Sequence, residues 1–310
     1  MTTLTPPPGS RMKPNSIPAA SSLPPFVAAP CASTAFGCPR DFLDNRFVYT
    51  VVSPRARGLS VGINMNPDKR CNFDCVYCEV TRDGSGSGAE LDVEAMASEL
   101  QETVDLVQSG RIRERPHYHG LSDELLKLRH VALSGDGEPT LCPNFTEAVE
   151  TVVHLRARGR FPFFKLVLIT NASGLDRPEV SAGLSLLTPR DEVWAKLEAG
   201  TSGYMMRVNR PDCSLEKILE NILQLARQRP VLIQSLFPSI KGEAPPSSEI
   251  DAYVQRLREL KAAGAQIPLV QIYSATRPTA RSECSHLPLR NLSAIAQRVR
   301  EVTGLDAEVF

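Results

Sequence analysis

The stretch that decides the fold is LSVGINMNPDKRCNFDCVYCEV, residues 59–80. Its first six residues, LSVGIN, are typical of a β-strand. The remainder contains Cys71, Cys75 and Cys78 in a C-x3-C-x2-C spacing, with Tyr77 directly before the last cysteine. Three of the chain's eight cysteines thus follow one strand closely. Buried structural cysteines explain neither the clustering nor the position in a loop, so the pattern favours a metal site.

Beyond this stretch, short β-branched segments alternate with longer segments of helical spacing. We predict six strands, at 59–64, 130–135, 165–170, 192–197, 231–237 and 268–274, and a short last strand at 306–310. We predict helices at about 93–107, 144–155, 178–187, 214–223, 248–263 and 292–302. Asn144 and Ser214 are candidate N-caps.

About six βα units predict a parallel sheet with right-handed crossovers. Six are too few for a closed barrel of eight, so the predicted fold is α/β, a partial (βα)6 TIM-like barrel with an open, curved parallel sheet. A doubly wound flat sheet is the alternative. In both folds the chemistry belongs beyond the C-terminal ends of the strands, where the three cysteines lie.

The N-terminal region differs in composition from the rest. Nine of the 25 prolines lie in the first 40 residues, among Ser, Thr, Ala and Gly. We therefore predict a disordered leader over residues 1–45 and one core domain over residues 46–310. Prolines interrupt the one apolar patch of the leader, which argues against a signal peptide, and the expected location is the cytoplasm.

The overall charge and hydropathy of the chain bear on two classes of partner, nucleic acids and membranes. Lys plus Arg and Asp plus Glu number 35 each, so the net charge gives no general attraction to nucleic acid or to an anionic membrane. No apolar run approaches the roughly 18–20 residues of a membrane-spanning helix.

Three thiolates allow two kinds of metal site. A structural zinc ion usually has four protein ligands, and the five histidines are all distant in sequence from the cysteines. A catalytic zinc ion with three ligands stays open as an alternative. A four-iron cluster is normally held by four thiolates, so three would leave one iron free to bind another molecule.

The cysteine motif, with an aromatic residue before its last cysteine, resembles that of the radical S-adenosylmethionine (radical SAM) superfamily. The resemblance implies that Cys71, Cys75 and Cys78 hold a [4Fe–4S] cluster. It also implies that the open iron binds the amino and carboxylate groups of SAM. An electron from the cluster then cleaves SAM to a 5'-deoxyadenosyl radical, which abstracts hydrogen from a substrate.

A second motif, ALSGDGEPTL at 132–141, follows the second of these strands. Its glycines let the backbone approach a ligand, and Glu138 could bind an ammonium group; a plain glycine-rich turn is the alternative. Its core, Gly135-Asp136-Gly137-Glu138-Pro139, is similar to the superfamily's GGEP segment, which binds the methionine amino group.

Three more segments narrow the resemblance to uncharacterised radical SAM proteins related to the wyosine-base (tRNA-modifying) synthases. They are SPRARGLSVGIN (53–64), WAKLEAGTSGYMMRVNRP (194–211) and VQIYSATRPTA (270–280). Glu198 stands where an aspartate is commoner, which keeps a carboxylate in place. The chain shows neither a flavodoxin-like segment nor an obvious second three-cysteine cluster.

Other residues are expected around SAM. Tyr77 is expected beside the cluster or the adenine, with a structural aromatic residue as the alternative. Thr170 and Asn171 are expected near the methionine carboxylate or the ribose, with a polar turn at the strand end as the alternative. Lys196 and Glu198 share a strand face, where charge in a parallel strand favours ligand binding. The remaining polar candidates for the cavity are Gln234, Gln271, Tyr273 and Arg277.

The cofactors implied are a [4Fe–4S] cluster and SAM, with a low-potential electron donor of flavodoxin or ferredoxin type as partner. The substrate is unidentified. One alternative is tRNA modification, to which two basic groups could contribute: Arg46, Arg55, Arg57, Lys69 and Arg70, and Arg111, Arg113 and Arg115. Arg55 and Arg57 could instead bind a phosphate or carboxylate, or be a solvated surface pair. Another alternative is a non-catalytic zinc or iron–sulfur protein. Cys31 and Cys38 could serve a second cluster, whereas Cys142, Cys213 and Cys284 have no metal-like spacing.

Overall fold

The computed structural model describes Met1 and residues 42–81, 90–277 and 279–310. The description below concerns the unit that ends at Phe310, from Phe42 onward. No described helix has the length and apolar character needed to cross a membrane.

This unit is built on one eight-stranded sheet. Its strands are β1 (Val48–Ser53), β2 (Gly58–Asn64), β3 (Leu128–Ser134), β4 (Lys165–Thr170), β5 (Glu192–Lys196), β6 (Val231–Leu236), β8 (Val270–Tyr273) and β10 (Ala307–Val309). They lie side by side in chain order. All neighbours pair in parallel except β1, which is antiparallel to β2.

Eight helices connect or flank these strands: α1 (Val93–Gln108), α2 (Asp123–Leu126), α3 (Phe145–Ala157), α4 (Pro178–Ser185), α5 (Ser202–Val208), α6 (Leu215–Gln228), α7 (Ser247–Ala262) and α8 (Leu289–Thr303). Short elements complete the described part: η1 (Phe42–Asp44), η2 (Arg111–Glu114), η3 (Pro139–Leu141), and the two-residue strands β7 (Ser239–Ile240) and β9 (Cys284–Ser285).

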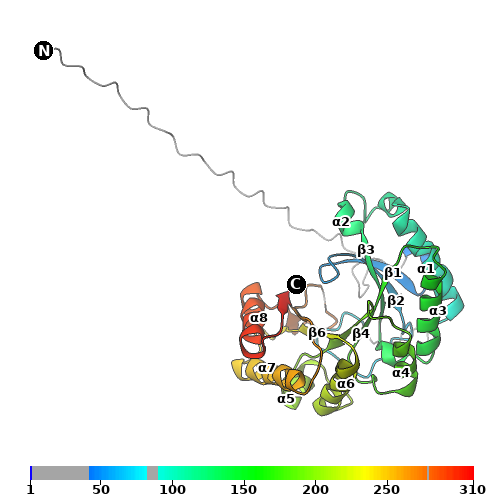
Figure 1. Ribbon diagram of the computed structural model, residues 1–310. Helices are drawn as coiled ribbons and strands as arrows, with labels where there is room; N and C mark the ends of the chain where they lie inside the picture. The colour runs from blue at the N-terminus through cyan, green and yellow to red at the C-terminus, as the bar shows by residue number, and fades with distance from the viewer. Residues whose placement is uncertain (2–41, 82–89, 278) are drawn as a thin grey trace. The chain divides into compact units, whose positions relative to one another are not determined.

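The strand order confirms the partial barrel and contradicts the doubly wound alternative. A doubly wound sheet needs a point at which the strand order reverses. Here the order never reverses, so successive right-handed crossovers place the helices on the same face. Figure 1 shows the sheet curled, with the helices around its outside.

The two faces of the sheet have different cores. On the outer face, strand residues such as Leu133 and Leu166 pack in the main apolar core together with helix residues such as Phe145. The alternate residues point inward, where Val167, Trp194 and Leu232 form a small separate cluster. The rest of the inner face carries polar side chains that a ligand could contact, such as His130, Lys196 and Gln234.

The turn between β1 and β2 reaches the opposite edge of the sheet. Arg57 pairs with Glu308 of β10 at 2.5 Å, and the Arg55 guanidinium lies 4.1 Å from the ring centroid of Tyr273 on β8. Because β1 and β10 are the two edges of the sheet, these contacts cross the open side of the barrel.

The boundary expected at residue 45 needs a correction. Residues 2–41 of the predicted leader, with Cys31 and Cys38, lie outside the described residues. Phe42–Asp44, however, forms η1, and the Phe42 side chain is buried. The folded unit therefore includes at least residues 42–45, because an aromatic side chain gains more by packing on the core than by exposure to water.

Candidate functional site

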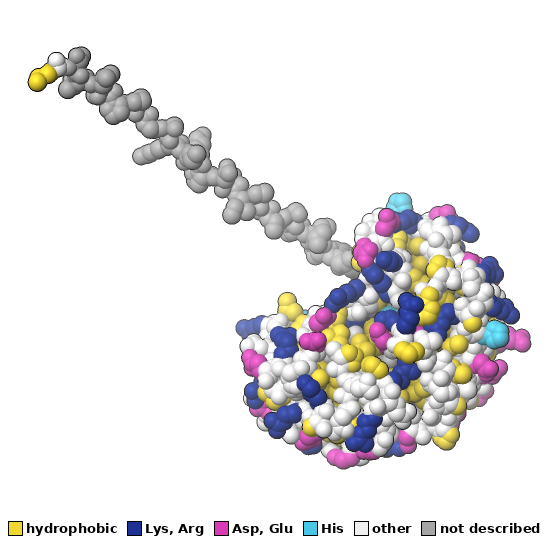
Figure 2. Space-filling model, viewed as in Figure 1, with side chains coloured by type: hydrophobic (Ala, Val, Ile, Leu, Met, Phe, Trp, Pro, Cys, Tyr) yellow, Lys and Arg dark blue, Asp and Glu magenta, His cyan; other side chains and the backbone are white. Residues whose placement is uncertain are grey.

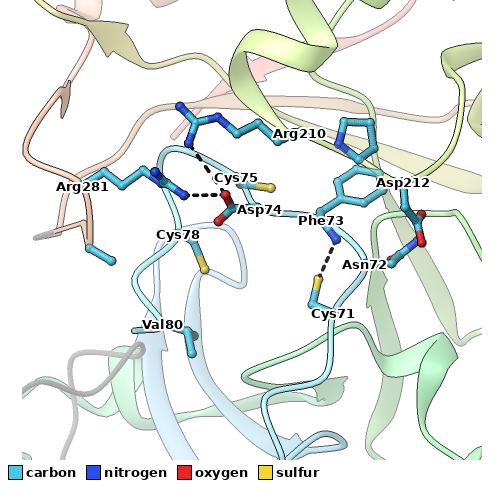
Figure 3. Close-up of a pocket in the computed structure, with 12 residues that line it drawn as sticks. Cys71, Asn72, Phe73, Asp74, Cys75, Cys78, Val80, Arg210, Asp212 and Arg281 are labelled. Atoms are coloured by element: carbon cyan, nitrogen blue, oxygen red, sulfur yellow. Dashed lines mark hydrogen bonds and ion pairs between the residues drawn. The ribbon is translucent and has the colours of Figure 1, made fainter. Parts of the chain in front are cut away.

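The three cysteines lie in the segment that follows β2, at the C-terminal edge of the sheet. Cys71, Cys75 and Cys78 line one pocket of about 800 Å³, and Figure 3 shows the three thiols around it. Asp74 lies in the same pocket, where it is paired with Arg281 and lies 3.7 Å from Arg210.

The cysteine segment is held in place by the residues that follow α5. The backbone N–H of Val76 donates to the carbonyl oxygen of Val208 at 2.8 Å, and that of Asp74 donates to Asn209 at 3.0 Å. Phe73 pairs with Pro211 as an antiparallel bridge. Backbone pairing thus fixes the position of the cysteines independently of any metal.

The sulfur atoms receive hydrogen bonds suited to thiolates. The Phe73 N–H donates to Cys71 Sγ at 3.4 Å, and Asn209 Nδ2 donates to Cys75 Sγ at 3.6 Å. Burial, with a contribution from Glu198, raises the pKa of the Cys75 thiol to about 12. This thiol therefore stays protonated near neutral pH unless a bound cation stabilises the thiolate.

Three thiolates leave two kinds of metal centre to consider. A structural zinc ion usually takes four protein ligands, whereas a four-iron cluster held by three thiolates keeps one iron open. Across residues 42–81, 90–277 and 279–310, no three His, Cys, Asp or Glu side chains form a group arranged for a single metal ion. Cys71, Cys75 and Cys78, which line one pocket, are the side chains that would hold a cluster.

The glycine-rich loop after β3 packs directly on this segment. The N–H of Glu138 donates to the carbonyl oxygen of Arg70 at 2.9 Å, and a Cβ atom at Gly137 would overlap that same oxygen. Gly135 has a φ of +146°, and a Cβ there would overlap Asn64 Oδ1. Asn64 in turn binds Asp136 through its side chain, with Nδ2 donating to Oδ2 at 3.0 Å. Only glycine permits this close approach.

Glu138 joins the ends of β3 and β4. Its carboxylate accepts hydrogen bonds from the Thr140 hydroxyl at 2.7 Å, the Asn171 N–H at 2.8 Å and the Thr170 hydroxyl. Burial raises the pKa of this carboxyl, while the hydrogen bonds from Thr170, Asn171 and Thr140 lower it. The side chain thus supports the loop from within, and the exposed face of the loop is left to backbone groups.

A second buried carboxylate supports the cysteines. Glu198 accepts hydrogen bonds from the Tyr77 hydroxyl and from Asn209 Nδ2, while Lys196 Nζ lies 5.3 Å from the centroid of the Tyr77 ring. Burial opposes the charge of Lys196, but Tyr273, Glu198 and the neighbouring thiols outweigh it and raise the pKa of the ammonium group. Lys196 and Glu198 therefore approach the same aromatic side chain, although β5 ends at Lys196 and Glu198 lies beyond the strand.

An inner cavity of about 330 Å³ brings most of the predicted residues together. The cavity is lined by Cys71, Cys75, Tyr77, Cys78, Gly135, Asp136, Gly137, Glu138, Thr170, Asn171, Lys196, Gln234, Tyr273 and Arg277. Pro139, Glu198 and Gln271, which were also predicted around the ligand, do not line it. Pro139 begins η3, and Glu198 lies behind Tyr77. Gln234 donates to Gln271 Oε1 at 2.9 Å.

Comparisons with solved structures concern the fold of the chain. Crystalline SuiB from Streptococcus suis, bound to S-adenosylmethionine, aligns with a TM-score of 0.55 and 13% identity, over 79% of this chain and 49% of that chain. TYW1 with a lysine-pyruvate adduct aligns with a TM-score of 0.52 and 16% identity, over 79% of this chain and 74% of that chain. The chain therefore shares the fold of these two structures.

The names of the UPF0026 sequence relatives state no activity. A UPF0026 protein of Methanocaldococcus jannaschii is 30% identical over 174 residues, 56% of this chain and 47% of that protein. The chain spans about half the length of the curated relatives it matches. No protein-family model matches the chain. The chain thus shares its fold with the solved structures, and its reaction is a proposal.

Sequence reasoning missed the asparagines that organise the candidate site. Asn64 fixes the glycine loop, Asn209 binds Cys75 and Glu198, and Asn72 accepts from Asn171 Nδ2 at 2.9 Å. Asn64 and Asn209 are buried. A detectable signal was present for Asn64, because a polar residue at the end of an apolar strand is unusual. Asn72 and Asn209 lie in loops, where asparagine is ordinary.

The packing of Gly137 predicts a defect in the cysteine segment. In Gly137→Ala, the new methyl group would push the Arg70 carbonyl away and lower the free energy of unfolding by about 1–3 kcal/mol. Thermal unfolding measures this loss, and the iron bound after anaerobic reconstitution should fall with it. Gly203→Ala is the control, because no atom lies within 4 Å of a Cβ at Gly203. Equal behaviour of the two variants would contradict the packing described here.

His130 predicts a pH dependence of stability. Burial, then the charges of Lys165 and Arg55, lower its pKa from 6.5 to about 3. Between these values the unfolded chain binds one more proton than the folded chain, so this contribution is complete above pH 6.5 and is lost as the pH falls. Urea unfolding at pH 7.5 and pH 5.5 should show an extra loss of about 1.4 kcal/mol in the native protein relative to His130→Gln. The exposed His117, changed to Gln, should leave the native slope intact; a native slope in His130→Gln would refute the prediction.

Proposed function

We propose that this protein is a radical SAM enzyme that abstracts hydrogen from an unidentified substrate. One observation carries the proposal: the three thiols of the loop after β2 and the glycine loop after β3 are pinned together beside one inner cavity. In this arrangement a ligand bound at the thiols also lies against the backbone of the glycine loop and the strand ends of the barrel.

In the proposed enzyme each residue has a defined task. Cys71, Cys75 and Cys78 hold a [4Fe–4S] cluster, and the loop Gly135-Asp136-Gly137-Glu138-Pro139 binds the methionine amino end of SAM. Its backbone does the binding, because the Glu138 carboxylate is already taken up by internal donors. Thr170 Oγ1 and Asn171 N–H also point at Glu138, so Asn171 contributes to SAM mainly by shaping the strand end.

Tyr77, Lys196 and Gln234 form the wall of the cavity between the thiols and the sheet. Tyr77 is fixed by Glu198, and Gln234 by Gln271. When bound, the cluster and SAM supply reductive cleavage of SAM and a 5'-deoxyadenosyl radical. The chain supplies orientation and excludes water from the curved interior. The proposed enzyme works in the cytoplasm with an electron donor of flavodoxin or ferredoxin type.

The EPR spectrum of the reduced cluster tests the proposal. After anaerobic reconstitution and reduction with dithionite, we expect a signal of a reduced four-iron cluster that changes shape when SAM is added. The change is expected because the methionine groups bind the open iron directly. A signal that SAM leaves unaltered, or a colourless protein containing zinc, would overturn the proposal. Iron well above four atoms per chain would support a role for Cys31 and Cys38 in a second cluster.

The basic residues considered for tRNA binding give little support to the alternative of tRNA modification. Several basic residues considered for it are engaged elsewhere: Arg57 pairs with Glu308, Arg113 pairs with Asp123, and Arg55 faces the inner cavity. The likeness to TYW1 concerns the fold. Salt-sensitive binding of tRNA by the reconstituted protein would revive this alternative.

A further inference from the structure

Two arginines of the β1–β2 turn have opposite surroundings. Arg57 points outward, with 69% of its side chain exposed, and pairs with Glu308. Arg55 is half-buried and lines the inner cavity. The turn itself is firmly held, because the Arg57 N–H donates to Pro54 at 2.9 Å and Arg129 Nε donates to the Arg57 carbonyl at 2.8 Å.

Among the described residues Arg55 has no carboxylate at ion-pair distance, although its charge acts on the Glu79 carboxylate that Arg277 contacts. Within the described part of the chain it forms no ion pair and no hydrogen bond from its side chain, and its Nε atom is buried without a partner. Its contact is the face of Tyr273, at 4.1 Å from the ring centroid. A guanidinium group offers five donors, and leaving a buried donor unpaired costs free energy. Such a cost is recovered when a ligand supplies the acceptor.

The other charges of the cavity are matched. Lys196 lies near Glu198, and Arg277 lies 3.6 Å from Glu79. Asp136 and Glu138, the remaining acidic residues of the lining, lie on the glycine loop after β3. The cavity therefore has an acidic side at that loop and two arginines, Arg55 and Arg277, that share the single carboxylate of Glu79 on the other side. Figure 2 shows several Lys or Arg side chains, in dark blue, around the hollow of the domain.

We propose that Arg55 binds an anionic group of the substrate, a carboxylate or a phosphate, inside the barrel. The planar guanidinium suits either group, because both accept two parallel hydrogen bonds. The position suits a substrate and not the methionine end of SAM, since the proposed methionine site is at the acidic loop. This inference rests on the proposed radical SAM function and adds the chemical class of the substrate.

The single tryptophan of the chain provides the probe. Trp194 lines the same cavity, and its ring meets that of His130 edge-on at 5.2 Å. The charge of Arg55 contributes, after burial and Lys165, to the lowered pKa of His130, so Arg55 and this ring pair share one electrostatic environment. Binding of an anion at Arg55 should change the Trp194 fluorescence.

The test is a titration of the reconstituted protein, with SAM present, by inorganic phosphate and separately by acetate at constant ionic strength. We expect a saturable change with at least one of them, and the tighter of the two identifies the group. Arg55→Met keeps the aliphatic contact with Tyr273 but removes the donors, and should weaken binding at least about tenfold. Arg55→Lys keeps the positive charge but loses the two parallel N–H donors of the guanidinium group, and should bind the anion with intermediate affinity.

Arg57→Met is the matched control, because it removes one positive charge from the same turn on its outer side. Its anion affinity should stay within about twofold of the native value, since exposed charges contribute little. Three results would overturn the inference: unchanged affinity in Arg55→Met, an equal loss in Arg57→Met, or competition between the anion and SAM. The last would assign Arg55 to the SAM carboxylate.

The same titration without metal or SAM separates this inference from the proposed function. Anion binding that depends on Arg55 in a chain that assembles no iron–sulfur cluster would leave the anion site standing and remove the radical SAM proposal. A SAM-responsive cluster together with no anion binding would remove only the anion site.

Discussion

Replacing any one of Cys71, Cys75 or Cys78 with serine is expected to abolish iron binding and SAM cleavage. Each thiolate of the proposed cluster binds its own iron, so no remaining side chain can take over a lost position. The reconstituted native protein should hold about four iron atoms per chain and absorb visible light, and each variant should hold almost none. Iron analysis and the absorbance spectrum measure this directly.

Cys213→Ser is the matched control for these variants. Cys213 is a half-buried thiol that lies just after the segment pairing with the cysteine loop, so its replacement tests a general effect of losing a thiol nearby. It should keep the native iron content. Full iron content in Cys71→Ser, Cys75→Ser or Cys78→Ser would contradict the assigned ligands.

The second large effect is expected at Glu138. Glu138→Ala removes the acceptor for the Thr140 and Thr170 hydroxyls and for the Asn171 N–H, all inside the protein. The free energy of unfolding should fall by about 3–5 kcal/mol, the range for removing one partner from a buried charged network. The glycine loop would lose its link to β4, so SAM affinity should fall as well. Chemical denaturation and SAM binding measure the two effects.

Glu138→Gln gives a sharper version of this test. Glutamine preserves the shape of the side chain. Its NH2 group, however, donates hydrogen bonds, and the surrounding groups of Thr140, Thr170 and Asn171 also donate, so the two would be left without acceptors. We expect a large part of the destabilisation to persist. Glu147→Gln, an exposed change in α3, is the control and should be nearly neutral. A native stability for Glu138→Gln would show that the carboxylate is not the centre of the network.

The repeating elements could be predicted because their signals are local. The strand at 165–170 matches β4 residue for residue, since a short β-branched run bounded by polar residues has few alternatives. Ser214 caps α6 as predicted, accepting from the Lys217 N–H at 3.2 Å. Asn144 occupies the N-cap position of α3, but its side chain donates to the Leu91 carbonyl. The role of Asn144 depends on Leu91, which lies 53 positions away in the sequence, so a local sequence pattern could not predict it.

The cysteine and glycine motifs could also be predicted, because parallel strands bring their C-terminal ends to one edge. The residues that support these motifs, such as Asn209, could not be predicted. Asn209 reaches Cys75 because residues 208–211 pair with the cysteine segment, and that pairing joins two loops. Strand β1 was not predicted either. Its antiparallel pairing with β2 creates the turn that places Arg55 inside and Arg57 outside, a difference that sequence spacing alone leaves open.

The most direct measurement of the central claim is the release of 5'-deoxyadenosine from SAM by the anaerobically reconstituted, reduced protein. Mass spectrometry should detect 5'-deoxyadenosine that depends on SAM, on the reductant and on Cys71, Cys75 and Cys78. Adding a substrate with an anionic group should increase its release in the native protein but not in Arg55→Met. A protein with a complete four-iron cluster that releases no 5'-deoxyadenosine under these conditions would contradict the account.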